Sequence, residues 1–441
     1  MDKKKILLRP SATVKNIIST LSRTGFKTFF VGGAVRDLLL GKSPADYDIV
    51  TNCPLPTLES IFHKEKIKVA GKTFPVLLIN DVEVAPPRYR DHDAHFPETD
   101  LGARDFTINS MALAPDSGHV IDPFDGKKDL ENKIIRFTRN PARRIEEDPV
   151  RMVRACRFKA AIKGNFSPKT LLAIKKNAVL ISTASAPERL RLEIMKAMSL
   201  PQPSAFFLAL READLLQHLL PCLDRCVDLD GGPHHGETVF EHCLMVGDAL
   251  SPRDPLLRLA GFLHDAGKFD AACMENNLLT FKGHETMKDA VLRDLETLRF
   301  STREIAFVDA MISVHMRPLT QESTPRAVRR LLAFLEAHHV SYQNFMKMRI
   351  ADKAANRAKK PYTLSEIRIR LQKIYDAQAA NQHQKFTQNT LAINGNDVMR
   401  LLDCDPGRKI GHILDHLFEQ VLDDPSLNTP EKLKGMVLDF I

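Results

Sequence analysis

The chain has 441 residues, a mass of 49.6 kDa and a formal net charge of +8, with 63 Lys and Arg against 55 Asp and Glu. This length exceeds what one hydrophobic core usually serves, so we expect about two to four domains and exclude a single small binding module. The hydrophobic fraction of 44% and the mean hydropathy of −0.21 indicate a globular protein. The basic excess suits a polyanionic partner, and nucleic acid is the first candidate.

The N-terminal segment is basic, but its apolar run from Ile6 to Leu8 is too short for the apolar region of a signal peptide. No later stretch approaches the roughly 18 apolar residues of a membrane helix. The 7 cysteines are odd in number and include no Cys-x-x-Cys pair, so neither a disulfide framework nor a zinc ribbon is predicted. We therefore expect a cytoplasmic protein with no membrane partner and with reduced, mostly buried thiols.

The first 140 residues mix strand and helix signals. In chain order, the hydrophobic pattern predicts a buried strand at 27–31, a helix at 34–40 and a second strand at 46–50. Two apolar runs then flank the turn-forming pair Asn80-Asp81, which predicts a hairpin. We expect an α/β region.

From about residue 141 the pattern becomes helical. Asp148 before Pro149 predicts an N-cap followed by proline at the first helical position. A turn-rich break at 228–233 separates a helical neck from a unit that begins near Glu237, and the polar segment 376–388 predicts a linker. The expected domains are a head at 1–140, a neck at 141–227, a further helical domain at 228–375 and a helical C-terminal segment at 389–441.

The pair Gly32-Gly33 lies between the first predicted strand and the helix after it. Exposed backbone N–H groups and the positive helix end can hold a triphosphate there, and Arg36 adds charge. Two glycines alone fit an ordinary strand-to-helix turn better. The carboxylates that follow change this interpretation.

Asp46 and Asp48 are two residues apart in the second predicted strand, so their carboxylates point to one face and can share divalent cations. Two-metal phosphoryl transfer needs such a pair, with one Mg²⁺ at the attacking hydroxyl and the other at the triphosphate. A solvated strand edge is the alternative, although adjacent like charges cost stability unless a cation compensates them. Glu83, on the predicted hairpin, is a candidate third carboxylate.

Residues 29–50, with Gly-Gly-Ala-Val-Arg-Asp followed by Asp-Tyr-Asp, resemble the first motif of the class II tRNA nucleotidyltransferase and bacterial poly(A) polymerase family. Four later segments resemble further motifs of this family in the family's order, at 104–110, 122–130, 147–151 and 185–193. The resemblance implies Mg²⁺ at Asp46 and Asp48, and Glu83 stays the candidate third catalytic carboxylate from its place on the hairpin. It also implies nucleotide-binding roles for Gly32, Gly33, Arg36, Arg104, Asp105, Asn109, Glu147, Asp148, Arg151 and Arg154.

The segment Glu147-Asp148-x-x-Arg151 also favours base selection on chemical grounds. On one helix, both carboxylates would share a face with the arginine. A carboxylate accepts from an exocyclic amine and a guanidinium donates to a ring nitrogen, a pattern that C and A offer and that U and G do not. The segment could therefore select C or A without a template, and an N-cap with helical ion pairs is an alternative that is compatible with this role.

Two departures from the family pattern bear on which nucleotides are added. Ala103 precedes Arg104-Asp105 where the family usually has two arginines, so one contact to the nucleotide or to the loop is not assured. The stretch from Arg88 to Ala103 is shorter than the family's flexible loop, and relatives without that loop add only the two cytidines. Residues 71–76 lack the double-basic pattern expected of a poly(A) polymerase. The sequence leaves open whether CC, A or full CCA is added.

A second candidate metal site lies in the middle of the chain. His242 falls in a predicted helix at 241–250, and His264-Asp265 ends another at 256–264. Imidazole and carboxylate together suit Mn²⁺, Ni²⁺, Co²⁺ or Mg²⁺. The order His242, His264-Asp265, Asp352 resembles the HD phosphohydrolase superfamily, with His284, Glu285 and His315 as further candidate ligands.

The HD resemblance implies phosphatase, 2′-nucleotidase or 2′,3′-cyclic phosphodiesterase chemistry, which could clean damaged tRNA 3′ ends before addition. The alternative is a degenerate domain that is kept only for packing. Basic residues recur at helical intervals in the same half and could follow tRNA phosphates, although solvated helix faces fit each cluster equally well. These clusters are Arg326, Arg329 and Arg330; Lys347, Arg349 and Lys353; Arg357, Lys359 and Lys360; and Arg368, Arg370 and Lys373.

The predicted fold is therefore α+β, with a small α/β, polymerase-beta-like nucleotidyltransferase head followed by an all-helical neck, an HD domain and a helical tail. The predicted function is template-independent addition of C, A or both to the tRNA 3′ end from CTP and ATP, with an additional metal-dependent HD phosphohydrolase activity. The alternatives are a poly(A) polymerase acting on other RNA and an HD phosphohydrolase whose head only binds RNA. The oligomeric state and the metal of the HD site are left open.

Overall fold

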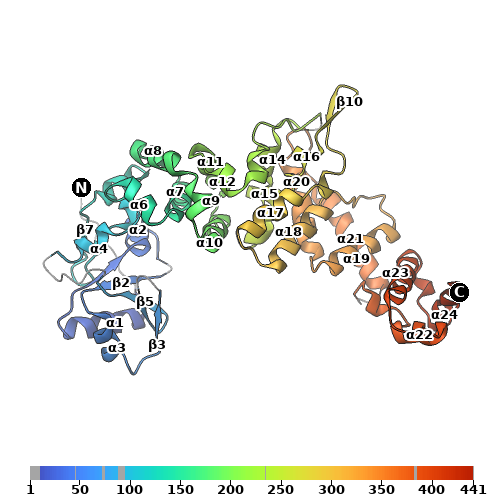
Figure 1. The fold of residues 1–441 in the computed structure, drawn as a ribbon, viewed down its shortest axis with the longest axis horizontal. Helices are drawn as coiled ribbons and strands as arrows, with labels where there is room; N and C mark the ends of the chain where they lie inside the picture. Colours follow the sequence, from blue (N-terminus) through green and yellow to red (C-terminus); the bar gives the residue numbers. More distant parts are fainter. Residues whose placement is uncertain are drawn as a thin grey trace. The chain divides into compact units, whose positions relative to one another are not determined.

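The computed structural model describes residues 10–44, 46–71, 75–87, 95–233, 235–381 and 385–440 (Figure 1). The chain divides into two compact units. The N-terminal unit comprises Met1–Glu193 and Ala205–Leu219, and the C-terminal unit comprises Ile194–Ser204 and Leu220–Ile441. The N-terminal unit holds the α/β part that the sequence predicts, and the C-terminal unit is mainly helical, so the α+β prediction is confirmed.

The N-terminal unit is built on one mixed sheet. Its strands are β1 (Thr28–Val31), β2 (Asp48–Thr51), β3 (Ile67–Ala70), β4 (Val76–Ile79), β5 (Val82–Ala85), β6 (Ala112–Leu113) and β7 (Val120–Ile121). They form a 7-stranded sheet in the order β3-β4-β5-β2-β1-β6-β7. Only the pair of β2 and β5 is parallel. This pairing sets the ends of two central strands beside each other.

Helices cover this sheet and continue beyond it. They are α1 (Ala12–Arg23), α2 (Gly33–Leu39), α3 (Leu55–Ile61), α4 (Glu98–Gly102), η1 (Thr107–Asn109), α5 (Gly126–Glu131), α6 (Pro141–Glu147), α7 (Val150–Ile162), α8 (Pro168–Asn177), α9 (Leu180–Ala184), α11 (Ser204–Glu212) and α12 (Leu216–Leu219). The short strands β8 (Ile134–Ile135) and β9 (Asn165–Phe166) pair in parallel. α1 and α2 pack against β1, and α3 packs against β4 (Figure 1). α10 (Pro187–Met198) begins in this unit and ends in the other.

The predicted elements of this unit are found with small shifts in their bounds. The hairpin turn at Asn80-Asp81 is confirmed, because both residues have positive φ, at 48° and 67°, as the tight turn between β4 and β5 requires. The second predicted strand begins at Asp48 and not at Asp46. Asp46 therefore lies in the loop before β2, so strand alternation does not fix the face to which its side chain points.

The helical N-cap predicted at Asp148 is wrong. The structure has two helices where the sequence predicts one, and Asp148 stands between α6 and α7 in an extended conformation. Pro149 explains the break between α6 and α7, because the residue before a proline is driven out of the α region. An extended residue would still suit an N-cap, but both carboxylate oxygens of Asp148 accept from Arg189 and do not cap α7. Pro149 occupies the N-cap position of α7, and no side chain caps that helix. Asn140 caps α6, because its side-chain oxygen accepts from the N–H of Ala142 at 2.9 Å.

The C-terminal unit is helical apart from one hairpin. Its helices are α13 (Pro221–Asp224), α14 (Val239–Ala249), α15 (Pro255–Leu263), α16 (Lys268–Ala271), η2 (His284–Thr286), α17 (Asp289–Thr297), α18 (Thr302–Val314), α19 (Pro325–Ala337), α20 (Tyr342–Ala355), α21 (Leu364–Ala380), η3 (Gln388–Thr390), α22 (Gly395–Leu402), α23 (Arg408–Asp423), η4 (Pro425–Leu427) and α24 (Pro430–Leu438). The strands β10 (Cys273–Glu275) and β11 (Leu278–Thr280) form the hairpin. α14 packs against both α15 and α20.

The start of α14 is fixed by a capping box. The hydroxyl of Thr238 accepts from the N–H of Glu241, and the Glu241 carboxylate accepts from the N–H of Thr238, at 3.2 and 3.3 Å. Reciprocal capping satisfies two backbone donors that a helix start otherwise leaves unpaired. The loop residue before this cap, Glu237, is therefore held close to the buried face of α14.

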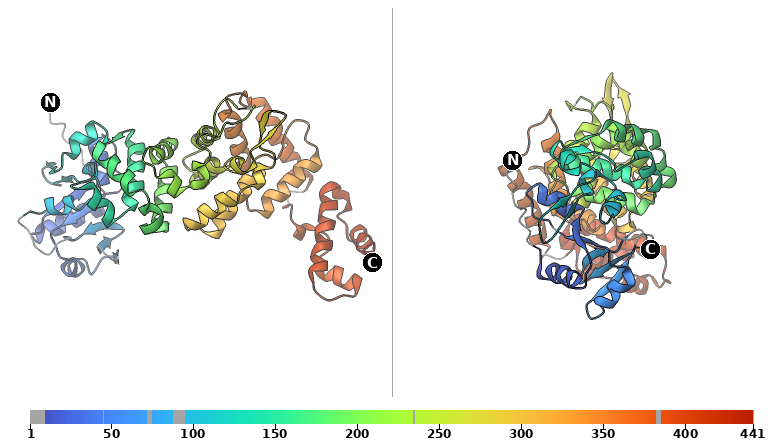
Figure 2. Two further views of the ribbon diagram at one scale, coloured as in Figure 1. Left: turned by 45° about the horizontal axis from the view of Figure 1, so that its top comes forward. Right: turned by 90° about the vertical axis from the view of Figure 1, so that its left-hand side faces the viewer.

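The predicted linker at 376–388 is wrong in its first part, because α21 continues to Ala380. Residues 382–384 of that segment lie outside the described residues. The helices α22, α23 and α24 pack on one another around Val398, Leu417 and Leu433. They form the red end of the chain in Figure 2. In the parts of the chain that the structure describes, no helix is both long and apolar enough to span a membrane.

Two of the predicted phosphate-tracking arginines are buried. Arg329 donates to the carbonyls of Leu422 and Asp423, at 2.7 Å each, and Arg370 donates to the carbonyl of Leu319 at 2.8 Å. Guanidinium donors commonly satisfy the free carbonyls at helix ends. The expectation that these two side chains meet tRNA phosphates is therefore wrong: Arg329 joins α19 to the end of α23, and Arg370 joins α21 to the loop between α18 and α19.

Candidate functional site

The turn between β1 and α2 brings a glycine against charged side chains. Gly32 has a positive φ of 69°, which favours glycine. A Cβ atom on Gly32 would lie 3.1 Å from Nη1 of Arg104 and 3.4 Å from Oδ2 of Asp48. The backbone, a guanidinium and a carboxylate thus meet at one point, where a side chain at position 32 would intrude.

Asp48 and Asp46 lie close enough to interact. Burial raises the pKa of Asp48, the nearby Arg104 opposes this, and the charge of Asp46 adds to the rise. Two carboxylates that disfavour each other's ionised form match a site for divalent cations, because a bound cation removes the repulsion. The donor set therefore fits Mg²⁺, which prefers oxygen ligands.

Glu83 lies on β5, next to β2, at the position that corresponds to Asp48 in the strand register. Ile49 of β2 is paired with Val84 of β5, and both are buried, so Asp48 and Glu83 precede this pair on the opposite face of the sheet. Glu83 is exposed. This register agrees with the expected third carboxylate.

A chain of hydrogen bonds connects α2 with η1 and α7. Arg36 donates to the side-chain oxygen of Asn109 at 2.7 Å, and Asn109 donates to Asp105 at 3.3 Å. Arg154 closes the chain with an ion pair to Asp105 at 3.0 Å. Burial lowers the pKa of Arg154, but the carboxylates around it, with Asp105 first, raise it overall, so its charge is held. Four of the residues expected to bind the nucleotide are thus joined in one network.

Phe158 lies beneath three arginines. The guanidinium carbons of Arg157, Arg36 and Arg154 are 4.3, 5.2 and 5.8 Å from the centre of its ring. Such cation–π contacts are each worth about 0.5–2 kcal/mol, depending on desolvation. They gather three guanidinium groups around one ring, and one of these groups, that of Arg36, also lies beside Gly33 of the glycine turn.

The residues expected to select the base are paired differently from the prediction. Glu147 forms an ion pair with Arg151 at 2.8 Å, as expected, and it also contacts Arg144. Among the described residues no ion pair joins the Asp148 carboxylate to Arg151, whose backbone N–H donates to the Asp148 carbonyl at 3.1 Å. Both oxygens of Asp148 instead accept from Arg189, at 2.9 and 2.6 Å. Arg189 belongs to the segment 185–193, which the sequence analysis singled out as a family motif. The sequence did not predict that Arg189 pairs with Asp148.

The second site gathers histidines and carboxylates from three helices of the C-terminal unit or from the residues directly after them. His242 comes from α14, His264 and Asp265 follow α15, and Asp352 comes from α20. Nε2 of His242 lies 3.2 Å from Oδ1 of Asp352 and 3.6 Å from Oδ2 of Asp265, and Nε2 of His264 lies 3.3 Å from Oδ2 of Asp265. All four predicted ligands are therefore together.

Two further predicted ligands join on the other side of Asp265. Nε2 of His284 and Nε2 of His315 lie 3.1 and 3.3 Å from Oδ1 of Asp265. Asp265 thus presents one oxygen to His264 and the other to this second pair. Burial would raise the pKa of Asp265, but the neighbouring His264 and Lys268 outweigh it, and the pKa is held well below its usual range.

Backbone carbonyls orient three of these imidazoles. Nδ1 of His264, His284 and His315 lies 2.9, 2.9 and 2.6 Å from the carbonyl oxygen three residues earlier in the chain. A proton on Nδ1 leaves Nε2 with a lone pair, which is the state that a metal ion needs. Nε2 of His264 is buried and makes no hydrogen bond with a described residue. The donor set fits one or two divalent metal ions.

Three residues of this site were missed by the sequence reasoning. Lys268 lies 2.8 Å from Oδ2 of Asp265 and 3.4 Å from Nε2 of His235. Glu237 is fully buried and lies 3.0 Å from Nδ1 of His235. The run His234-His235-Gly236-Glu237 just before the predicted helix could have indicated further polar residues at this site. The residues that contact it, Lys268 and Arg357, are distant in the sequence and could not be predicted.

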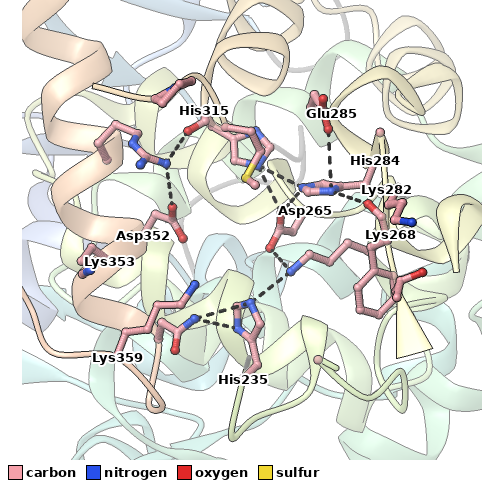
Figure 3. Close-up of a pocket in the computed structure, with 18 of the residues that line it drawn as sticks. His235, Asp265, Lys268, Lys282, His284, Glu285, His315, Asp352, Lys353 and Lys359 are labelled. Carbon is pink, nitrogen blue, oxygen red and sulfur yellow. Dashed lines mark hydrogen bonds and ion pairs between the residues drawn. The ribbon is translucent and has the colours of Figure 1, made fainter. Parts of the chain in front are cut away.

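A cavity of about 850 Å³ opens onto this cluster of candidate metal ligands (Figure 3). Asp265, His284, His315 and Asp352 are among the residues that line it. Its remaining polar wall is mainly basic, with Lys268, Lys282, Arg349, Lys353 and Lys359. Phe281 and Tyr362 add aromatic surface. The cavity thus combines metal ligands with cationic groups, which is what a phosphate ester requires of its binding site.

Three family models match the chain in order. A model described as the poly A polymerase head domain matches residues 28–136, one for the RNA and SrmB-binding site of polymerase A matches 165–227, and one for tRNA nucleotidyltransferase domain 2 matches 278–437. These matches cover the α/β sheet, the helices after it and most of the C-terminal unit.

Relatives and solved structures agree with these matches. A multifunctional CCA protein of Methylococcus capsulatus is 34% identical over 294 residues, which are 61% of this chain and 67% of that protein. An A-adding tRNA nucleotidyltransferase of Deinococcus radiodurans is 27% identical over 431 residues, 92% of this chain and 94% of that protein. The crystal structure of the Bacillus stearothermophilus CCA-adding enzyme in complex with CTP has the same fold, with a TM-score of 0.69, 23% identity and 98% of each chain covered.

Proposed function

The chain belongs to the class II family of CCA-adding enzymes and bacterial poly(A) polymerases, and from that premise we propose that it adds C, A or both to the 3′ end of tRNA from CTP and ATP. One observation carries the proposal: Asp48, with Asp46 near it, lies against the Gly32 turn and Arg104. Carboxylates for metal, a glycine turn and a guanidinium for the triphosphate are the groups that this reaction needs in one place.

In the proposed reaction, the 3′-hydroxyl of the tRNA attacks the α-phosphate of the nucleotide. A new P–O bond forms, the bond between the α- and β-phosphates breaks, and pyrophosphate leaves. Mg²⁺ held by Asp46 and Asp48 supplies charge neutralisation on the phosphates when bound. Gly32, Gly33 and Arg36 bind the triphosphate, and Arg104 and Asp105 hold the sugar region. The hydroxyl proton passes to a carboxylate or to water.

Base selection is assigned to Asp148 and Arg151. Each already has a partner, since Asp148 is held by Arg189 and Arg151 by Glu147. These pairs fix the directions of the carboxylate and the guanidinium before a base arrives, which lowers the ordering cost of binding. We assign catalysis to residues 1–140, base selection to 141–227, phosphohydrolysis to 228–375 and tRNA binding to 389–441.

A second activity is proposed for the C-terminal unit, namely metal-dependent hydrolysis of a phosphate ester. The observation that favours it is the set of His264, His284 and His315, whose Nδ1 atoms all face a carbonyl while Nε2 faces Asp265. A divalent ion such as Mn²⁺, Ni²⁺, Co²⁺ or Mg²⁺ supplies Lewis acidity when bound by these residues with His242 and Asp352. Lys268 and Arg349 then hold the phosphate oxygens in the cavity.

The deciding experiment for the first activity offers three tRNAs, ending before CCA, after C and after CC, to the full chain with Mg²⁺ and each nucleotide separately. Extension of at least one of them supports the proposal, and the lane that is extended identifies CC, A or complete CCA addition. No extension of any tRNA by CTP or ATP would overturn it. The A-adding relative that aligns along nearly the whole chain makes the tRNA ending in CC the most informative lane.

The alternative within the family is a poly(A) polymerase, which the match to the poly A polymerase head domain also allows. A non-tRNA oligoribonucleotide with ATP alone separates the two functions. Long adenosine tails on this primer favour the polymerase, and a requirement for the tRNA body favours tRNA repair. If only phosphate-ester hydrolysis is observed, the N-terminal unit serves only to bind RNA.

A further inference from the structure

Glu237 is a buried carboxylate that no prediction used. Its Oε2 accepts from the backbone N–H of Gly236 and of Arg357, at 3.0 and 3.2 Å. Its Oε1 lies 3.0 Å from Nδ1 of His235 and 3.3 Å from Nδ1 of His242. The side chain has 0% exposure. A buried charge is kept only where such partners compensate it, so its position is tightly determined.

The hydrogen bonds around Glu237 require it to act as an acceptor. Backbone N–H groups can only donate, and two of them contact Oε2. Glu237 therefore offers two acceptor oxygens. The two backbone donors use Oε2, which leaves Oε1 for the imidazoles.

His242 needs an acceptor at Nδ1 to act as a metal ligand. Its Nε2 makes a hydrogen bond with Oδ1 of Asp352 at 3.2 Å and lies 3.6 Å from Oδ2 of Asp265, while its buried Nδ1 makes no hydrogen bond with a described residue. A metal ion on Nε2 requires the ring proton on Nδ1. Oε1 of Glu237 lies 3.3 Å from Nδ1 and would accept from that proton once the ring carries it there. The other three imidazoles of the cluster use backbone carbonyls instead.

We infer that Glu237 is the positioning residue of the metal site, acting through His242 to keep its Nε2 free for the ion. The inference rests on the proposed metal-dependent function of the C-terminal unit. A carboxylate behind a liganding imidazole fixes its tautomer and direction and increases its basicity. His235 shares the same carboxylate, so the position of Glu237 also sets the imidazole that faces Lys268 in Figure 3.

The variant Glu237→Gln tests this role without a change in volume. The two backbone N–H groups can only donate, so the glutamine oxygen must take the place of Oε2. Its amide N–H₂ then faces both imidazoles and donates to Nδ1, which places their ring protons on Nε2. His242 loses the lone pair that the metal needs, while the packing around residue 237 is kept.

The measurement is Co²⁺ binding to the full chain, followed by visible absorption and by competition with a chelator. It is done with Asp46→Ala and Asp48→Ala in place, so that these carboxylates take up no Co²⁺. We expect Glu237→Gln to weaken Co²⁺ binding by about 10- to 100-fold and to alter the absorption bands. The conservative variant Glu237→Asp should restore part of the affinity, because it keeps the acceptor charge.

The matched control is Glu241→Gln, which lies one turn further on and is half exposed. Gln still serves a capping box, so this variant should bind Co²⁺ like the parent chain. Unchanged Co²⁺ affinity and spectrum in Glu237→Gln would overturn the inference while leaving the metal site intact. If the parent chain itself shows no Co²⁺ band that His264→Ala removes, the metal site and the inference both fail. If Glu237→Gln does not fold, Glu237→Asp is the deciding variant. A Co²⁺ affinity within about threefold of that of the parent chain would then contradict the inference.

Discussion

The two candidate sites of this chain are organised in opposite ways. The carboxylates of the N-terminal unit are partly open to solvent, and one of them, Asp46, lies in a loop before β2. In the C-terminal unit His242, His264 and Asp265 are all buried, and each imidazole direction is fixed by a carbonyl or a carboxylate. The first site is suited to be completed by its substrates, and the second is built before any ligand arrives.

This difference fits what each site is proposed to hold. A nucleotide brings a large negative charge. The N-terminal unit has guanidinium groups near Phe158 and Asp105 that are held by cation–π contacts and ion pairs while no nucleotide is bound. A metal ion in a buried cluster needs neutral imidazoles with a free Nε2, and only fixed hydrogen-bond acceptors can guarantee that tautomer. Substitutions should therefore affect chemistry in the first unit and metal retention in the second.

The largest effect is expected at Asp48. Asp48→Ala removes the half-buried carboxylate beside Gly32, and nucleotide addition should fall by at least about 100-fold because charge on the phosphates is no longer neutralised. The quantity to measure is kcat for CMP or AMP transfer to tRNA. If kcat falls less in Asp48→Ala than in Glu83→Gln, Asp48 is not the main metal ligand.

Asp265→Asn should affect the C-terminal site most, because Asp265 contacts both groups of histidines. We expect loss of phosphohydrolysis together with loss of Co²⁺ or Mn²⁺ from the purified chain, measured by metal analysis. His284→Ala touches only one group and should retain part of the bound metal. Equal metal loss in the two variants would contradict a bridging position for Asp265.

Arg189→Lys should have an intermediate effect on the N-terminal site. Lysine keeps the charge but cannot hold both oxygens of Asp148, so the direction of this carboxylate is released. We expect the preference for CTP and ATP over UTP and GTP, measured as ratios of kcat/KM, to fall roughly 10-fold. Unaltered ratios would show that Asp148 is positioned by other contacts.

Removal of metal should change stability in one unit more than in the other. An ion present at about 100 times its Kd stabilises the state that binds it by about 2.7 kcal/mol, or about 5–10 °C in Tm for a unit of this size. Calorimetry with and without Co²⁺ should show this shift in a chain that carries Asp46→Ala and Asp48→Ala. The shift should vanish when His264→Ala is added, and a shift that persists would locate the stabilising ion elsewhere.

Local patterns predicted much of this organisation. The strand, glycine turn and helix around Gly32, the hairpin turn at Asn80-Asp81 and the ligands His264-Asp265 all depend on neighbours within a few residues. The helical N-cap at Asp148 was wrong because its carboxylate accepts from Arg189 and not from the backbone at the start of α7. Its real partner, Arg189, is 41 residues away.

Partnerships across longer distances were out of reach of the sequence pattern. Glu237 is defined by His242 and by the N–H of Arg357, which is 120 residues further along the chain. Arg329 looks like a phosphate-binding residue in the sequence, but it is buried against carbonyls at the end of α23. Charge and spacing give the candidates, and only the fold decides which charges face solvent.

Transfer of labelled CMP and AMP to tRNA that lacks its CCA end tests the two-site organisation most directly, when the parent chain, Asp48→Ala and Asp265→Asn are compared side by side with Mg²⁺. We predict transfer by the parent chain and by Asp265→Asn, and loss of transfer in Asp48→Ala. No transfer by the parent chain, or an equal loss in both variants, would contradict separate sites for nucleotide addition and phosphate-ester hydrolysis.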